Sequence, residues 1–190
     1  MDENRTMQAV KILAERILGG AILCARGAEK ELDKLFKPKW QRLIINLKRS
    51  DKNQLSVRIH LIVFLFFYIA DKLAYEILGQ KDRDKLMPIL WTEIFKSASA
   101  FIKATPDGKS EYLYEVKDQY ADFVRRFSKY EIWGEGRIKF QDTLLYVVTE
   151  YIIDNTTNHR KDIFTTSCFC EVLVKALSSL EIKKILESAK

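Results

Sequence analysis

Turn-forming residues are scarce in this chain. Glycine occurs seven times and proline three times among 190 residues, whereas the two together make up roughly 12% of an average protein. Sheets of many short strands need frequent tight turns, so most all-β sandwiches and barrels are disfavoured. Apolar residues, at 47% of the chain, are numerous enough to build a hydrophobic core. The composition therefore predicts a folded chain that is mainly helical.

Apolar side chains recur at helical spacing along nearly the whole chain. The first example is a stripe with alternating steps of three and four residues, which places its members on one face of a long helix. The members of this stripe are Met7, Val10, Ala14, Ile17, Ala21, Cys24 and Ala28. Gly19 and Gly20 fall within the stripe, so we expect them to kink the helix, to end it, or to let another segment come close.

Polar residues, glycine and proline separate the later helices from one another. These helices are expected at about 39–49, 54–78, 82–104, 110–129, 141–155 and 162–177, with a short one from about 180. Helix 54–78 ends before Gly79 and is apolar on almost every side, which is typical of the central helix of a bundle. Residues 131–140 are predicted to be irregular or a small hairpin. The predicted fold is an all-α, single-domain bundle of about seven helices over residues 1–190.

The sequence predicts neither export nor a membrane anchor. Its N-terminal residues are acidic and lack the basic and apolar regions of a signal peptide. The longest apolar run, residues 61–70, is half as long as the roughly 20 residues that span a membrane. Three cysteines, Cys24, Cys168 and Cys170, do not form a disulfide framework and suit a reducing compartment. We therefore expect a cytoplasmic protein without a transmembrane segment.

The common catalytic and cofactor-binding motifs are absent from the sequence. It contains no glycine-rich phosphate loop, no His-Glu-x-x-His zinc helix, no Gly-x-Ser-x-Gly elbow and no Cys-x-x-Cys pair. The two histidines, His60 and His159, lack the Glu-x-x-His pattern of a di-iron bundle and offer little acid–base capacity at neutral pH. The sequence predicts no cofactor, no metal and no catalytic residue, so an enzyme is the class that it favours least.

One face of helix 54–78 combines polar and aromatic side chains. The helix positions i, i+4, i+7 and i+11 are occupied by His60, Phe64, Phe67 and Asp71. This spacing places them on a common face. Together with Tyr68 and Trp91, they are candidates for an apolar pocket that would bind a small molecule or a lipid near His60. The alternative is that the two polar residues only make hydrogen bonds within the bundle.

Helix 110–129 carries a line of carboxylates, which is termed the acidic ridge. Its members lie within about 60° of one another around the helix axis. They are Glu111, Glu115, Asp118 and Asp122. A ridge about 16 Å long cannot enclose one metal ion. We interpret it as a solvated face or as a docking surface for a basic partner.

The formal net charge of +6 is concentrated in one short segment, which is termed the basic patch. Its members are Lys34, Lys37, Lys39, Arg42, Lys48 and Arg49. No acidic residue interrupts them, and the expected helix 39–49 is amphipathic. The patch is therefore either the solvated back of a core helix or a surface that binds nucleic acid or an anionic membrane.

Three functions remain open at this point. The leading hypothesis is a non-catalytic interaction or adaptor module that self-associates, because the stripe that begins at Met7 contains small residues and the two charged surfaces are complementary. The second is a helical protein that binds a small molecule or lipid in a pocket near His60. The third is binding of nucleic acid or of an anionic membrane surface through residues 34–49.

Overall fold

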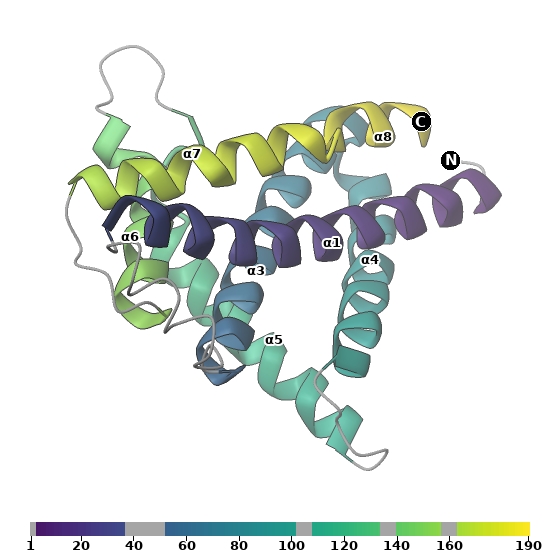
Figure 1. Ribbon diagram of the computed structural model, residues 1–190. Coiled ribbons are helices and arrows are strands. Elements are labelled where there is room, and N and C mark those ends of the chain that lie inside the picture. The colour runs from purple at the N-terminus through teal and green to yellow at the C-terminus, as the bar shows by residue number, and fades with distance from the viewer. Residues whose placement is uncertain (1–2, 37–51, 102–107, 134–139, 157–162) are drawn as a thin grey trace. The chain divides into compact units, whose positions relative to one another are not determined.

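The computed structural model of this protein describes residues 3–36, 52–101, 108–133, 140–156 and 163–190. Every regular element within these ranges is a helix (Figure 1), which confirms the predicted all-α fold class. The α-helices are α1 (Glu3–Phe36), α3 (Lys52–Leu78), α4 (Gln80–Phe101), α5 (Gly108–Phe127), α6 (Leu144–Thr156), α7 (Ile163–Ser179) and α8 (Ile182–Ser188), and a short 3-10 helix covers Phe140–Asp142.

Several helix ends agree with the breaks in the sequence, and others do not. Helix α3 ends one residue before Gly79, as predicted. Helix α1 continues through Gly19 and Gly20 without ending. The predicted helix 39–49 lies outside the described residues. The same is true of 134–139 in the predicted irregular segment, whose first residues, 131–133, are not helical.

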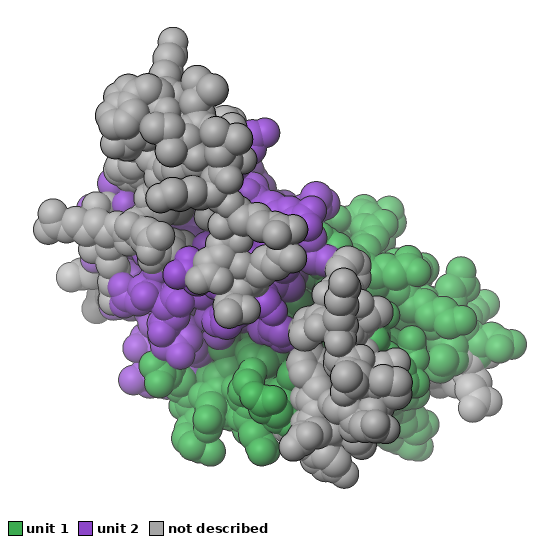
Figure 2. All heavy atoms as spheres, turned by 60° about the horizontal axis from the view of Figure 1, so that its bottom comes forward, with its two compact units in different colours: residues 1–20, 63–126, 179–190 green, residues 21–62, 127–178 purple. Residues whose placement is uncertain are grey.

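The described chain divides into two compact units, which Figure 2 shows in green and purple. Unit 1 consists of Met1–Gly20, Val63–Arg126 and Ser179–Lys190, and unit 2 consists of Ala21–Ile62 and Phe127–Ser178. Helices α1 and α3 therefore each contribute residues to both units. The single domain expected from the sequence stays a prediction.

In unit 1, helices α3 and α4 form a hairpin with a connection of one residue. Gly79 has φ +75°, a left-handed conformation that glycine adopts without strain. Its N–H donates to the Tyr75 carbonyl at 3.1 Å, and its carbonyl accepts from the Arg83 N–H at 3.1 Å. Gly79 thus caps the last turn of α3 and accepts the first hydrogen bond of α4, so one residue is enough to connect the two helices.

The apolar run that predicted a central helix is buried. Each residue from 62 to 70 of α3 is at most 5% exposed. The apolar stripe of α1 is covered by the rest of the chain as well, since all its members except the half-buried Met7 are buried. The stripe is therefore part of the chain's own core and is not a free surface for a second copy.

In unit 2, the buried guanidinium of Arg58 joins three helices. Its side chain on α3 is 1% exposed. Its Nη1 donates to the Ala25 carbonyl on α1 at 3.1 Å, and its Nε donates to the Thr156 hydroxyl at 3.2 Å. Its Nη2 donates to the carbonyl of the same threonine, which is the last residue of α6. A fixed positive charge at this position also complements the negative end of the α6 dipole.

Two cysteine thiols of unit 2 are buried in apolar surroundings. Burial raises the pKa of Cys24 from 9.0 to about 12, although the charge of Arg58 acts in the opposite direction. Burial also raises the pKa of Cys170, against a hydrogen bond with Thr149. Cys168 is half-buried. The thiolate is the reactive form, so the two buried thiols are expected to be inert at neutral pH.

We expect native protein at pH 8 to react with a disulfide reagent such as dithionitrobenzoate mainly through Cys168. Because the pKa of Cys24 is about three units high, its thiolate population is lower by roughly a thousandfold. The absorbance of the released thiol would show one fast equivalent, and the other two only after unfolding. Cys168→Ser should remove the fast phase. A fast phase that persists in this variant would contradict the buried positions of Cys24 and Cys170.

One described segment meets the length and composition criteria for a membrane span. It covers Ile163–Ser188, its most apolar window has a mean hydropathy of 1.4, and 39% of that window is buried inside the chain. The core helices of soluble proteins meet the same criteria. The hydropathy of this segment therefore does not distinguish a membrane span from a core helix. The absence of a transmembrane segment stays a prediction.

Candidate ligand-binding groove

A groove between α3, α4 and α5 of unit 1 is a candidate site among the described residues. Its volume is about 690 Å³, within the range of roughly 300–1,000 Å³ that is usual for ligand pockets. It is lined by Phe67, Asp71, Arg83, Asp84, Met87, Pro88, Trp91, Thr92, Lys117 and Tyr120. The lining residues Asp84, Pro88 and Lys117 are exposed, so the groove is open to solvent. It is termed the α3–α4–α5 groove below.

Three aromatic rings from three helices form one wall of the groove. Phe67 and Trp91 meet edge to face with centroids 5.2 Å apart. Tyr120 lies 5.3 Å from the first ring and 5.0 Å from the second. Behind them, the buried rings of Phe64 and Phe95 contact Trp91. Edge-to-face and tilted packing at these distances is favourable, so the wall is held in place before any ligand arrives.

Arg83 closes one end of the α3–α4 hairpin and lines the same groove. Its Nε and Nη2 donate to the two carboxylate oxygens of Asp71, each at 2.7 Å, and its Nη1 donates to Asp84 at 2.7 Å. These hydrogen bonds raise the pKa of Arg83 above its ordinary value, so its guanidinium stays charged. Three of the five guanidinium N–H groups are used in this way. The other two N–H groups have no acceptor among the described residues.

Further hydrogen-bond donors of the groove have no partner among the described residues. The Lys117 ammonium makes no ion pair there, and neither the Tyr120 hydroxyl nor the Trp91 N–H makes a hydrogen bond. Both of these aromatic polar atoms are accessible to solvent. Burial of the Tyr120 ring, together with the negative charge of Asp71, raises the pKa of Tyr120. The hydroxyl therefore remains a protonated donor at neutral pH.

Pro88 lies inside α4 and changes the hydrogen bonding of the groove wall. Proline has no N–H, so the Asp84 carbonyl lacks the donor that a helix normally provides four residues later. The Thr92 hydroxyl donates to the Pro88 carbonyl at 2.9 Å, one turn further along. Asp84, Pro88 and Thr92 all line the groove, so this altered hydrogen bonding lies in its α4 wall.

The structure brings together only part of the pocket that the sequence suggested. Phe67, Asp71 and Trp91 line the groove, whereas Phe64 stacks behind Trp91 at 6.5 Å. Tyr68 is buried against Phe123. His60 belongs to unit 2, where its Nδ1 lies 2.9 Å from the carbonyl of Ser56, one turn earlier. His60 is thus not one of the groove residues.

Sequence reasoning missed most of the groove lining on α4 and α5. The missed residues are Arg83, Asp84, Met87, Pro88 and Thr92 of α4, and Lys117 and Tyr120 of α5. One signal was present, because Asp84, Pro88 and Thr92 recur at steps of four and share a helix face. Their role became visible only with the neighbouring helices in place.

The acidic ridge is exposed where it is described. Glu115, Asp118 and Asp122 are exposed on α5, and the Glu111 side chain lies outside the described residues. Asp122 pairs with Arg125 at 3.0 Å, and Glu115 accepts a hydrogen bond from Gln119 at 3.2 Å. Such local contacts are those of a solvated helix face. The described residues contain no group of three or more His, Cys, Asp or Glu side chains that could hold a metal ion.

The basic patch cannot be placed from the structure. Lys34 falls within α1, but its side chain lies outside the described residues. The same holds for all of Lys37, Lys39, Arg42, Lys48 and Arg49. The binding of nucleic acid or an anionic membrane through residues 34–49 therefore stays a prediction.

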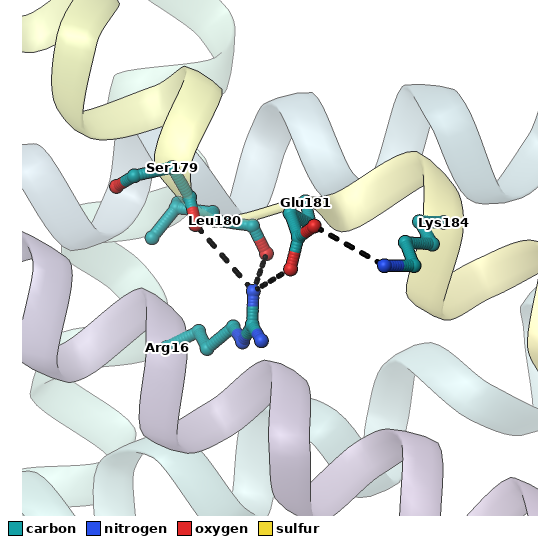
Figure 3. Close-up of polar contacts among 5 residues, drawn as sticks. All are labelled: Arg16, Ser179, Leu180, Glu181 and Lys184. Atoms are coloured by element: carbon teal, nitrogen blue, oxygen red, sulfur yellow. Dashed lines mark hydrogen bonds and ion pairs between the residues drawn. The ribbon is translucent and has the colours of Figure 1, made fainter.

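A second polar cluster in unit 1, shown in Figure 3, joins α1 to the connection between α7 and α8. The Nη1 of Arg16 donates to the carbonyls of Ser179 and Leu180 at 3.4 and 3.3 Å. It also pairs with a carboxylate oxygen of Glu181 at 2.6 Å, and Lys184 approaches the other oxygen at 3.4 Å. Since Arg16 satisfies carbonyls at the end of α7, we interpret this cluster as a structural clasp.

The clasp predicts a small acid-dependent loss of stability. Hydrogen bonds from Arg16 and Lys184 lower the pKa of Glu181 from about 4.5. A lowered carboxyl pKa contributes stability that is fully present above pH 4.5 and is lost as the pH falls through the folded-state pKa. Urea unfolding of wild type and Arg16→Gln should therefore differ more at pH 6 than at a pH low enough to protonate Glu181, where only the hydrogen bonds from Arg16 to the two carbonyls still separate them. A difference that is the same at both values would show that the carboxylate charge contributes nothing.

Comparisons with known proteins matched no protein family, no curated protein and no solved structure.

Proposed function

We propose that this protein binds a small molecule in the α3–α4–α5 groove. The observation that carries the proposal is a preformed aromatic wall in a cavity of about 690 Å³, bordered by donors that have no partner among the described residues. Ligand sites typically combine an apolar lining with a few polar groups that fix orientation. Here Phe67, Trp91 and Tyr120 supply the apolar contact, and Lys117 and Arg83 supply the polar groups.

The fixed geometry of the groove favours binding. The Asp71–Arg83 ion pair and the ring contacts hold α3, α4 and α5 in register, so a ligand need not order them. Binding affinity rises when less freedom is lost on association. The groove also opens on a face where Pro88 and Lys117 are exposed, which gives a ligand a route inward.

Self-association remains a hypothesis with less support. Its main argument was the small-residue stripe of α1, which is buried within this chain. The complementary charge of the acidic ridge still favours a basic partner, but its exposed carboxylates also suit a solvated face. We therefore rank ligand binding above an adaptor role.

The proposal can be tested with an apolar fluorophore such as anilinonaphthalene sulfonate. We expect saturable binding of one molecule per chain under native conditions. Thr92→Trp would place a large ring within the groove lining and should weaken binding at least tenfold. Lys96→Trp, one turn along α4 and outside the lining, is the matched control and should bind as wild type does. Binding that is absent, or equal in the two variants, would overturn the proposal.

A further inference from the structure

We propose that the ligand of the α3–α4–α5 groove is an amphipathic monoanion, with an apolar body and one carboxylate, whose carboxylate pairs with Lys117. This inference rests on the proposed function, because it assigns a chemical class to the same site. It follows from the distribution of paired and unpaired charges around the groove.

Among the described residues, Lys117 is the charged side chain of the groove lining that makes no ion pair. Asp71 and Asp84 are both engaged by Arg83, whereas the Lys117 ammonium has no ion pair among the described residues. A carboxylate that meets this ammonium would form a charge-assisted hydrogen bond, which is stronger than a neutral one. A cationic ligand would find fewer open acceptors, since both carboxylate oxygens of Asp71 and one of Asp84 already accept hydrogen bonds from Arg83.

The remaining polar atoms of the groove are mostly donors. They include the Tyr120 hydroxyl, the Trp91 N–H and two N–H groups of Arg83. Tyr120 and Lys117 lie three residues apart on α5, so both are on one side of that helix. A carboxylate accepts several hydrogen bonds at once and can use both groups.

The two carboxylates limit the charge of the ligand to one. A phosphate monoester carries about −1.5 to −2 charges at neutral pH. Its second negative charge would have no unpaired cation among the described lining residues and would be repelled by Asp71 and Asp84, which line the same groove. A single carboxylate is neutralised by Lys117 alone. The groove therefore favours carboxylates over phosphate esters.

The aromatic wall of the groove favours a ligand whose body is apolar. Phe67, Trp91 and Tyr120, together with Met87 and Pro88, offer ring faces, ring edges and a flexible thioether. Flat rings stack on such a surface, and a thioether adapts to their outline. An alkyl chain would also be buried there. Aromatic carboxylates and fatty acids thus share the required chemistry, and an experiment has to separate them.

Two matched pairs of probes, titrated calorimetrically, test this inference. The first is 2-naphthoic acid with its neutral amide, and the second is decanoic acid with decanol. We expect the acid of at least one pair to bind about tenfold more tightly than its neutral partner. The pair with the tighter acid identifies a ring or a chain as the body. The preference should shrink at 1 M salt because an exposed ammonium is screened.

Variants of Lys117 assign the preference to this residue. Lys117→Gln should make acid and neutral probe bind equally while leaving the neutral probe unaffected, and Lys117→Arg should retain the preference. Lys81→Gln removes an exposed lysine charge outside the groove lining and should change nothing. Equal binding of acid and neutral probe to wild type, or a preference that survives Lys117→Gln, would overturn the inference and leave groove binding intact. Failure of every probe, including the fluorophore, would overturn both.

Discussion

Replacement of Arg58 by alanine is expected to lower the free energy of unfolding by about 3–5 kcal/mol, the largest single-residue effect that we predict. The wild-type guanidinium is 1% exposed and donates to the Ala25 carbonyl, the Thr156 carbonyl and the Thr156 hydroxyl. Alanine would leave these acceptors buried without that donor, and each such group costs about 1–3 kcal/mol. The void left by the long side chain adds to the loss.

Two further variants separate hydrogen bonding from side-chain volume. Arg58→Lys keeps the charge but cannot reach acceptors on two helices with a planar fork, so we expect an intermediate loss of stability. Arg26→Ala removes an exposed arginine that directly follows Ala25 on α1 and should change stability by less than about 0.5 kcal/mol. Urea unfolding monitored by circular dichroism provides the measurement. A loss below about 1 kcal/mol for Arg58→Ala would contradict the buried position of this side chain.

The sequence predicts the helices because their signals are local. Gly79 marks the end of α3, and the apolar run 61–70 marks a buried helix, since both depend on residues within one or two turns. Arg58 gives no such signal. Its partners are mainly backbone carbonyls, which any residue carries, so its burial depends on how α1, α3 and α6 meet. In the sequence, Arg58 is only a charged residue that precedes the apolar run 61–70.

The groove could be predicted only in part, because its lining also depends on how separate helices pack. Helical spacing correctly placed Phe67 and Asp71 on one face of α3, but it placed His60 there too. Eleven residues separate His60 from Asp71, about 16 Å along the helix, and the two belong to different units. The Asp71–Arg83 pair depends on the one-residue turn at Gly79, and the role of Tyr120 depends on where α5 packs.

Gly20 is expected to resist substitutions that the adjacent Gly19 accepts. A Cβ atom built at Gly20 would lie 2.6 Å from Cδ2 of Leu180, a buried residue beside α8, whereas one at Gly19 meets nothing within 4 Å. Both glycines lie inside α1, where alanine is favoured over glycine by about 0.5–1 kcal/mol. Gly19→Ala should therefore stabilise the protein by about that amount.

Gly20→Ala should not give the stabilisation expected of Gly19→Ala, because the Leu180 side chain must move out of its packed position. Gly20→Val adds two methyl groups to the overlap, so we expect it to destabilise the protein by about 1–3 kcal/mol. Leu180→Ala should relieve the overlap, so the double variant with Gly20→Val would be more stable than the sum of the two single changes predicts. Urea unfolding of wild type, the two single variants and the double variant tests this coupling. Strictly additive effects would show that α1 and Leu180 are not in contact at Gly20.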